Sequence, residues 1–447
     1  MPRPVRRRLT EPGHAGRWVW ARRPARRATR VPALHARANP FSDARSTGRP
    51  QPMTVASTAP SPTQLLSNAE ELVPKLRGRA SKTEELRQLP DATVSDFAAA
   101  GFFTAMLPAA LGGSEIDLTT FVKIVRTLSR GDASAGWVGA FLMSHGLMLA
   151  RYGQEAQADF FNGRPYALAA AAATPPGTAE PTEGGYRVTG RWRFGSGVMH
   201  AGWVLVSADS PTGPLSVALP IDEVTIVDTW HVPGMRGTGS NDIVADAVFV
   251  PAHRTIDFGL LSSDCAPAAA LHPGYALLAY PLNRVLPVIH AAVGLGTADA
   301  ALELFRANIG KRIRPQTRGR VVDEPLVRSA YAKAWDLLHV AGLQLHDAIA
   351  LTDALYGPAH AREATLEDRA AINLGVTGSG TKAFAAIDLV IQASGASIFR
   401  TGDPLDRICR DVQVMRNHAS ADFTSMSAVA GGVLLGQGLG DFADPVF

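Results

Sequence analysis

Apolar residues recur at helical spacing once the chain has passed residue 60. The repeating positions are Leu65, Leu66, Ala69, Leu72 and Val73. Steps of three and four residues place such side chains on one face of a helix. Pro90 and Pro108 punctuate the pattern. We therefore predict an N-terminal helical domain over residues 60–165.

The pattern changes between residues 166 and 275, where short β-rich runs are separated by Gly, Pro and Asp. The runs are 186–188, 203–206, 215–219 and 243–250. Short apolar runs with turn residues between them are typical of sheets built from hairpins. We predict that this region is a small antiparallel β-barrel or sandwich.

Long helical patterns return after a loop rich in Ala, Pro and Ser at about residues 259–273. They cover approximately residues 281–311, 324–355, 366–394 and 403–436. Four helices of this length suggest a four-helix bundle over residues 281–447. The fold class predicted from the whole pattern is α+β, mainly α.

The first 52 residues differ from the rest in composition. They are rich in Arg, Pro and Ala and lack apolar periodicity, so they bury too little surface to offset the entropy of ordering. We predict a disordered leader. A transit peptide or export signal is one interpretation, although no apolar core follows the arginines at 6–8. The other is an over-extended start, with Met53 as the true initiator.

The leader also accounts for the basic balance of the chain. It holds thirteen Arg against Glu11 and Asp43, whereas the whole chain has a net charge of +4. Residues 53–447 are therefore net acidic, which argues against nucleic-acid binding and charge-driven membrane binding.

Cysteine usage and hydropathy narrow the class further. Cys265 and Cys409 are too few for a disulfide framework or a zinc site, and no CxxC spacing surrounds them. No apolar run without charge or polar interruption approaches the roughly 18 residues that cross a bilayer. We expect a soluble, cytoplasmic protein with no metal site.

Seven short motifs carry a family resemblance through their order and spacing. They are EELRQLP (84–90), GFFTAMLP (101–108), GDASAGW (131–137), GRWRFGSG (190–197), GMRGTGS (234–240), QASGAS (392–397) and RD (410–411). Together they resemble the acyl-CoA dehydrogenase superfamily over roughly residues 60–440 and, within it, the group D flavin-dependent monooxygenases. That branch includes 4-hydroxyphenylacetate hydroxylase and the steroid-ring phenol hydroxylase of actinobacteria. The resemblance implies an acyl-CoA dehydrogenase-like fold: a helical domain, a middle β-barrel and a four-helix bundle.

The segment DVQVMRNHAS, residues 411–420, points to the oxygenase branch. His418 stands where the resemblance places the catalytic glutamate of the dehydrogenases, and no carboxylate lies between Asp411 and Asp422. An imidazole exchanges a proton near pH 7 more readily than a glutamate at its usual pKa. The resemblance implies that His418 assists formation of a flavin C4a-hydroperoxide or positions the substrate. The alternative is a histidine that only caps or packs the last long helix.

Ser196 lies in FGSG at the end of a predicted strand. Its flanking glycines let the backbone approach a flat ring closely. The resemblance implies that the Ser196 hydroxyl bonds near flavin N5 and steadies the hydroperoxide, with Phe194 and Gly197 beside the cofactor. The alternative is a plain turn serine.

His145 lies in the apolar segment MSHGLML, where an unpaired imidazole would be costly to bury. Two interpretations stay open. One is a satisfied core histidine. The other follows from the resemblance, which implies that His145 contacts the hydroxyl of a phenolic substrate and stabilises a phenolate.

Arg312 and Gly395 are the remaining cofactor-binding candidates. Arg312, in KRIRPQ, resembles the arginine that this fold directs at the flavin phosphate chain, and Gly395 resembles the glycine turn through which a neighbouring subunit contacts the cofactor. A homotetramer is implied. Lys311, Arg314 and Arg318 are nearby alternatives to Arg312, and a solvated charge run is the plainer interpretation of this cluster.

The chain lacks a convincing nicotinamide-binding loop. Gly294 and Gly296 fall inside a predicted helix, and Asp299 stands where the third small residue of such a loop belongs. A separate NAD(P)H:flavin reductase is then implied, which supplies reduced FMN or FAD.

These inferences predict the oxygenase component of a two-component monooxygenase that uses reduced flavin and O2 to hydroxylate a small aromatic, phenolic substrate. Three alternatives remain. They are an acyl-CoA dehydrogenase, an N- or S-oxidising monooxygenase of the same fold, and a non-catalytic flavin-binding paralogue.

Overall fold

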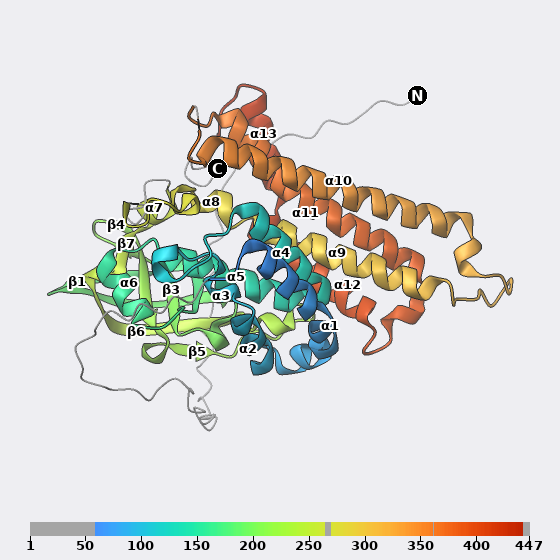
Figure 1. Cartoon of the computed structure of the whole chain (residues 1–447), viewed down its shortest axis with the longest axis horizontal. Helices are drawn as coiled ribbons and strands as arrows, with labels where there is room; N and C mark the ends of the chain where they lie inside the picture. The colour runs from blue at the N-terminus through green and yellow to red at the C-terminus, as the bar shows by residue number, and fades with distance from the viewer. Residues whose placement is uncertain (1–58, 264–269, 361, 441–447) are drawn as a thin grey trace, which may run out of the picture. The chain divides into compact units, whose positions relative to one another are not determined.

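The computed structural model describes residues 59–263, 270–360 and 362–440. The described part belongs to a single compact unit of helices beside one sheet (Figure 1). The predicted leader, the proposed initiator Met53 and Cys265 lie outside the described residues.

Six helices form the first part of this unit. They are α1 (Pro62–Leu86), α2 (Asp91–Ala99), α3 (Phe102–Ala105), α4 (Leu118–Gly131), α5 (Ala133–Leu149) and α6 (Gln154–Phe161). Aspartates begin the two central ones: Asp117 accepts a hydrogen bond from the third residue of α4, and Asp132 does the same for α5. Helix α5 is buried along almost its whole length. It packs against α4, the later helix α9 and the sheet, so it forms a central support for the site.

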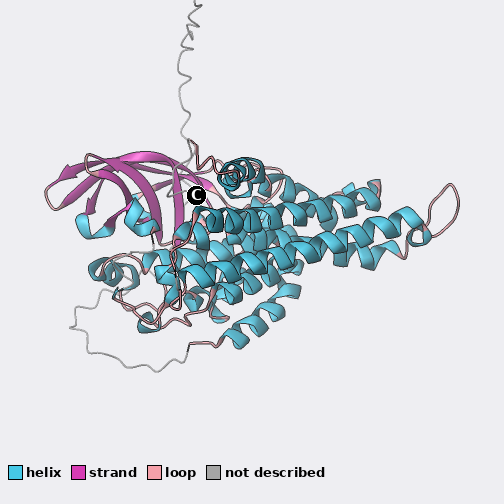
Figure 2. Ribbon diagram, turned by 90° about the horizontal axis from the view of Figure 1, so that it is seen from above, coloured by secondary structure: helices cyan, strands magenta, loops and turns pink. Residues whose placement is uncertain are grey.

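The predicted antiparallel barrel is wrong, because the sheet is open and mixed. Its strands are β1 (Ala169–Thr182), β2 (Gly185–Gly195), β3 (Trp203–Ser210), β4 (Gly213–Pro220), β5 (Thr225–Val227), β6 (Asn241–Pro251) and β7 (Thr255–Asp257). Their order is β5-β6-β2-β1-β3-β4-β7, with β5 and β7 at the two edges. Figure 2 shows the sheet to one side of the helices. After β2 the chain crosses to the far side of β1, so β3 runs parallel to β1 while the other pairs are antiparallel.

All four predicted β-rich runs lie within strands, namely β2, β3, β4 and β6. The longest strand, β1, was missed. Its sequence AAAAATPPGTAEPT is built from alanine, proline and threonine, and alanine and proline are depleted in strands. Pairing on both sides, with β2 and β3, overrides that weak local preference.

The last part of the chain is helical. Its helices are α7 (Phe258–Ser262), α8 (Leu282–Val285), α9 (Val288–Ile309), α10 (Pro325–Tyr356), α11 (Leu366–Ser394), α12 (Pro404–Met415) and α13 (Phe423–Leu434). Helices α9, α10 and α11 lie side by side (Figure 1), and α9 also packs against α4. The fourth long helix predicted at 403–436 is broken into α12 and α13. Asp422 begins α13 by accepting a bond from Ser425, and a 3-10 turn precedes it.

Two apolar stretches, Leu282–Ile309 and α11, are long and apolar enough to cross a membrane by length and composition alone. Most residues of each are buried against neighbouring helices. Burial in the protein core therefore accounts for their hydropathy.

Candidate active site

An aromatic row on α5 forms the base of the site. Trp137, Phe141 and His145 follow at steps of four residues and so share one helix face. Their ring centroids lie 5.1 Å apart for Trp137 and Phe141 and 5.2 Å apart for Phe141 and His145. Trp137, at one end of the row, carries the indole N–H that reaches Ser196.

Ser196 sits in a turn whose backbone is bent at both sides. Phe194 and Gly197 have φ of +66° and +72°, and Gly197 donates to the carbonyl of Thr238 at 2.9 Å. The indole of Trp137 donates to Ser196 Oγ at 3.1 Å. The Phe194 side chain is 62% exposed, and its ring lies 6.2 Å from that of Trp230. The turn thus presents an exposed aromatic ring next to a half-buried hydroxyl.

A loop between β5 and β6, residues 228–240, supports Ser196 from behind and is called the support loop below. Ser240 Oγ lies 2.8 Å from Ser196 Oγ, and Thr238 Oγ1 lies 2.7 Å from Ser240 Oγ. Thr238 Oγ1 in turn donates to the Met235 carbonyl at 2.9 Å. An unbroken line of hydroxyl groups therefore runs from Ser196 into the protein.

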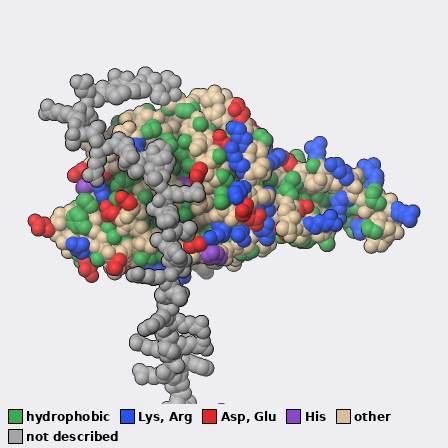
Figure 3. Space-filling view, turned by 90° about the horizontal axis from the view of Figure 1, so that it is seen from below, with side chains coloured by type: hydrophobic (Ala, Val, Ile, Leu, Met, Phe, Trp, Pro, Cys, Tyr) green, Lys and Arg blue, Asp and Glu red, His purple; other side chains and the backbone are tan. Residues whose placement is uncertain are grey.

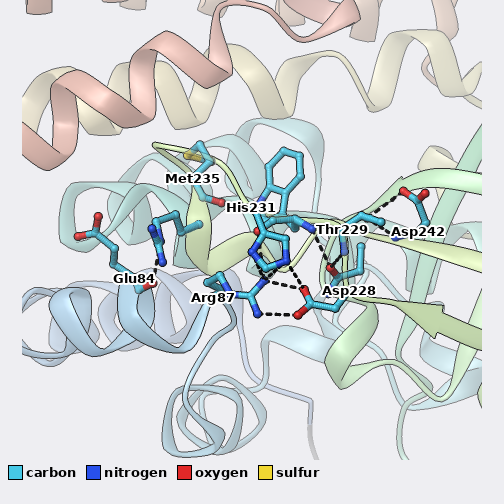
Figure 4. Close-up of polar contacts among 10 residues, drawn as sticks. Glu84, Arg87, Asp228, Thr229, His231, Met235 and Asp242 are labelled. Carbon is cyan, nitrogen blue, oxygen red and sulfur yellow. Dashed lines mark hydrogen bonds and ion pairs between the residues drawn. The ribbon is translucent and has the colours of Figure 1, made fainter. Parts of the chain in front are cut away.

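The support loop is fixed to the end of α1, as Figure 4 shows. Arg87 forms a two-pronged ion pair with Asp228, at 2.6 and 2.8 Å, and also reaches His231 Nδ1 at 3.3 Å. Arg236 Nε donates to the Glu84 carbonyl at 3.1 Å. Arg236 therefore links the support loop to the last turn of α1.

A buried carboxylate anchors the other side of the support loop. Asp411 on α12 accepts a hydrogen bond from the backbone N–H of Met235 at 2.5 Å. Asp132 lies near it, and both carboxyl groups are almost fully buried. Burial, with repulsion from Asp132, raises the pKa of Asp411 to about 7. Burial likewise raises the pKa of Asp132 to about 6. Arg407, Arg410 and Glu84 are the other charged groups that act on this pair.

This pair predicts a pH-dependent stability. Both pKa values are raised above the ordinary value near 3.8. The favourable contribution of the two protonated carboxyl groups to the free energy of unfolding is therefore fully present below about pH 4, and it is lost as the pH rises through 6 to 7. In Asp411→Asn the amide oxygen still accepts from Met235 but carries no charge. We expect the free energy of unfolding of this variant to fall less than that of the wild type between pH 5 and 8, by roughly 2–4 kcal/mol at about 1.4 kcal/mol per pKa unit.

Thermal midpoints of both proteins across that pH range measure the difference. Asp422→Asn serves as the control. Asp422 is an exposed residue that caps the start of α13, and its pKa is lowered. Equal pH slopes for Asp411→Asn and the wild type would refute the assignment.

His418 lies in the break between α12 and α13, not within a helix as predicted. Its ring centroid is 5.2 Å from Trp137 and 5.1 Å from His290. Nδ1 accepts from the backbone N–H of Ser420 at 3.2 Å, so the neutral ring carries its proton on Nε2. Although the residue as a whole is exposed, the loss of water around the packed ring lowers the pKa of His418. The histidine therefore does cap a short turn, and it also keeps an N–H free to act as a donor.

His290, on α9, is a site residue that the sequence did not reveal. Its ring lies 5.3 Å from Trp137, and its Nε2 donates to the Met415 carbonyl at 3.0 Å. Burial, with repulsion from His418, lowers the pKa of His290 to about 3. It lies in an apolar segment without a motif, and only its contacts in space identify it.

His145 is buried at the end of the aromatic row opposite to Trp137. Its Nδ1 donates to the Ala169 carbonyl at 2.8 Å, which leaves Nε2 as an acceptor in the neutral ring. Burial lowers the pKa of His145 to about 4. The ring is therefore a partnered core histidine that also presents a basic nitrogen at neutral pH.

Arg312 and Gly395 lie together but away from Ser196. Arg312 donates to the Ser394 carbonyl, and a Cβ on Gly395 would come within 2.8 Å of its guanidinium. Arg312 follows the C-terminal end of α9, whereas His290 lies in the first turn of that helix, and the helix from His290 to Ile309 spans about 29 Å at 1.5 Å per residue. Lys and Arg side chains gather at this end of the molecule (Figure 3). One chain thus has two separate groups of cofactor-binding candidates.

The residues around Ser196 fit a flat, redox-active ring. An exposed aromatic side chain, a glycine turn that packs its backbone closely and a fixed hydroxyl are grouped there. A Cβ on Gly197 would lie 3.1 Å from a Val138 methyl, and the φ of +72° is one that residues with a side chain rarely adopt, so the turn favours glycine. Among the described residues, no three His, Cys, Asp or Glu side chains are grouped to hold a metal ion.

Comparison with known proteins agrees with this geometry. Residues 64–162 match the N-terminal domain of acyl-CoA dehydrogenases, and residues 288–423 match their C-terminal domain. These matches define the class: a protein of the acyl-CoA dehydrogenase fold.

Relatives place the chain within that class. A pigment production hydroxylase of Rhodococcus sp. is 32% identical over 83% of this chain and 95% of its own length. The oxygenase subunit HsaA of a flavin-dependent monooxygenase from Rhodococcus jostii is 31% identical over 80% and 94%. The crystal structure of 3-HSA hydroxylase from Rhodococcus sp. RHA1 covers 86% of this chain and 99% of its own, with a TM-score of 0.79 and 29% identity. The chain belongs to the flavin-dependent monooxygenases of the acyl-CoA dehydrogenase family, as the motifs indicated.

Proposed function

We propose that this chain is the oxygenase component of a two-component monooxygenase that hydroxylates a small phenolic substrate with reduced flavin and O2. The observation that carries the proposal is the grouping of Ser196, Trp137 and His418 beside an exposed aromatic ring, with no free carboxylate at the position of a dehydrogenase base. Named relatives support the substrate class, among them a resorcinol hydroxylase and a p-hydroxyphenylacetate 3-hydroxylase.

Reduced flavin, when bound, supplies the electrons that activate O2. In our proposal Phe194, Ser196 and Gly197 hold its ring, and the Ser196 hydroxyl faces N5. His418 exchanges a proton through its free Nε2–H, since Nδ1 is occupied by Ser420. The aromatic row of α5 keeps water away from this face.

His145 is proposed to contact the substrate. Its Nδ1 is fixed by Ala169, so a phenol can donate its O–H to Nε2. Partial transfer of that proton increases the electron density at the ring carbon next to the hydroxyl, which favours attack on an electrophilic oxygen.

Arg312 and Gly395 are proposed to contact the flavin of a neighbouring subunit. They lie near the C-terminal end of α9, whereas Ser196 is linked through Trp137 to His290 in the first turn of that helix. A homotetramer would bring the two groups to one cofactor. Exposed apolar residues on α10 support further assembly: Leu326, Trp335 and Leu343 are 83%, 56% and 56% exposed. We further propose that residues 60–165, 166–275 and 281–447 act as three domains, the last forming a bundle when subunits assemble.

A separate NAD(P)H:flavin reductase is the proposed source of reduced flavin, and a cytoplasmic location fits such a partner. The proposal includes both FMN and FAD as the flavin that the reductase supplies. A related resorcinol hydroxylase is named as FADH2-dependent. The Streptomyces protein XiaF, 27% identical with a TM-score of 0.79, was solved with FADH2 and glycerol.

The residues around His418 favour the oxygenase over an acyl-CoA dehydrogenase. No carboxylate lies between Asp411 and Asp422. Asp411 accepts from Met235, and Asp422 accepts from Ser425 at the start of α13, so both flanking carboxylates act as structural acceptors.

Anaerobic mixing of the protein with reduced FMN or FAD, followed by O2 in a stopped flow, tests the proposal. We expect a transient absorbance that belongs to neither reduced nor oxidised flavin, and hydroxylated product when a phenol is present. Transient absorbance with product only from amines or thioethers would favour N- or S-oxidation. Flavin reduction by acyl-CoA thioesters would favour the dehydrogenase. Reoxidation of the flavin without a transient absorbance, together with no reduction by thioesters, would favour a non-catalytic paralogue.

A further inference from the structure

The line of hydroxyl groups behind Ser196 has a direction. At one end, the indole N–H of Trp137 can only donate, and it points at Ser196 Oγ. At the other end, the Met235 carbonyl can only accept, and Thr238 Oγ1 lies 2.9 Å from it. Two oxygens at that distance need a proton between them, so the single proton of Thr238 is directed at Met235.

The donor in each of the remaining hydrogen bonds follows from this first assignment. Because Thr238 has used its proton, the 2.7 Å contact with Ser240 requires Ser240 to donate. Ser240 has then used its own proton, so in the 2.8 Å contact with Ser196 the donor is Ser196. Each hydroxyl donates inward, away from the surface where Phe194 lies. Ser196 Oγ is left with a free lone pair and no free proton.

The far end of the line is held in place. Met235 has a left-handed backbone, with φ of +51°, and its N–H is bound by the buried Asp411. Its carbonyl also accepts from Trp230 Nε1 at 2.9 Å. Thr238 and Ser240 are 2% and 3% exposed, so water does not compete for their protons. The polarity of the line is therefore built into the fold.

The two redox states of flavin differ at the atom that would meet Ser196. Reduced flavin carries a proton on N5 and can donate there, whereas oxidised flavin has only a lone pair on N5. An acceptor at Ser196 matches the first and repels the second.

We infer that the relay Ser196, Ser240 and Thr238 makes the site selective for reduced flavin over oxidised flavin by fixing Ser196 as a hydrogen-bond acceptor. This inference rests on the proposed function, since it takes the flavin ring to lie at Ser196. Ser240 and Thr238 are positioning residues in this scheme, because they act through Ser196. The consequence is that oxidised flavin leaves readily and the next reduced flavin replaces it.

The test is the ratio of two dissociation constants, for oxidised FMN in air and for reduced FMN under anaerobic conditions, measured by fluorescence and absorbance titration. In Thr238→Val, Ser240 loses its acceptor and can donate to Ser196, which frees the Ser196 proton for N5. We expect the preference for reduced FMN to fall about fivefold or more, the worth of one hydrogen bond. The Met235 carbonyl keeps its other donors, so no buried group is orphaned.

Ser240→Ala removes the acceptor of Ser196 directly and should lower the ratio similarly. Thr238→Ser is the matched control, because it keeps the hydroxyl and should keep the wild-type ratio. Unchanged ratios in folded Thr238→Val or Ser240→Ala would overturn the inference. If neither variant folds, the wild type still decides, because equal affinity for both redox states would also overturn it.

The same titrations separate the two proposals. A wild type that binds both flavins equally, yet gives the transient absorbance with O2, overturns only the inference about the relay. A wild type that binds neither flavin overturns the proposed function as well.

Discussion

Replacing His418 by asparagine is expected to lower the rate of product formation about 100-fold or more, the usual loss when a positioned proton-exchanging group is removed. Asparagine accepts hydrogen bonds at helix starts as well as any residue, so the variant keeps the contact to the Ser420 N–H. It lacks an imidazole that can exchange a proton. His418→Asn therefore separates the capping role of this residue from a chemical one.

His418→Ala should lose product formation to the same extent and lose some stability as well, because the cap is removed. Both variants are expected to keep flavin binding and the wild-type oligomeric state. Product per flavin oxidised, flavin affinity and thermal midpoint are measured for each. His253→Ala is the control, since His253 pairs with Asp159 at 2.8 Å and follows the end of β6 opposite to Asn241, which pairs with Gly195 beside the site. Wild-type product yield in His418→Asn would leave His418 with only its structural role.

The pH dependence of His418 has a definite sign. Its pKa is lowered by desolvation, so the neutral ring with Nε2–H predominates at pH 7. Protonation at lower pH would break the acceptor contact at Nδ1. Activity that depends on His418 should therefore decline toward acid pH and not toward neutrality.

Helix α11 illustrates what local sequence signals can predict. Its bounds agree with the predicted range because both ends carry strong signals. Thr365 and Asp368 form a capping box at the start. At the end, Gly395 takes a backbone with φ of +69° that other residues rarely adopt. Where both ends of a helix carry such local signals, the apolar periodicity between them is sufficient to predict the bounds of the helix.

The break at His418 illustrates what those signals omit. The apolar pattern runs on through residues 403–436, so periodicity predicted one helix. The chain breaks where the His418 ring packs against Trp137 and His290, which lie on two helices far away along the sequence. His290 was missed for the same reason. Its function in the site comes from contacts that no local window contains.

The prediction of a closed barrel failed for a different reason. The residues 186–188 and 243–250 were correctly read as strands, but the class of sheet depends on which strand lies beside which. An alanine-rich β1 placed between β2 and β3 makes one parallel pair and leaves two edges. The motifs, by contrast, identified the family because they mark turns at Ser196 and Gly234 whose backbone geometry tolerates few substitutions.

Gly234→Ala is the substitution expected to damage the fold most directly, because it acts where the support loop contacts α12. A Cβ at this position would lie 2.0 Å from the Arg410 carbonyl oxygen and 2.6 Å from the Asp411 amide nitrogen. Both are backbone atoms of a helix and cannot rotate away. We expect the free energy of unfolding to fall by about 3 kcal/mol or more.

The damage should extend to the site. Moving the support loop away from α12 breaks the contact between Met235 and Asp411, and with it the line of hydroxyls that ends at Ser196. Denaturant unfolding and titration with reduced FMN measure the two effects on one sample. Gly78→Ala is the matched control: a Cβ there meets open space within helix α1, so a gain of about 0.5–1 kcal/mol is expected from helix propensity alone. If Gly234→Ala unfolds at the wild-type denaturant concentration and binds reduced FMN with wild-type affinity, the support loop does not position Ser196, and the serine turn alone determines how the hydroxyl is held.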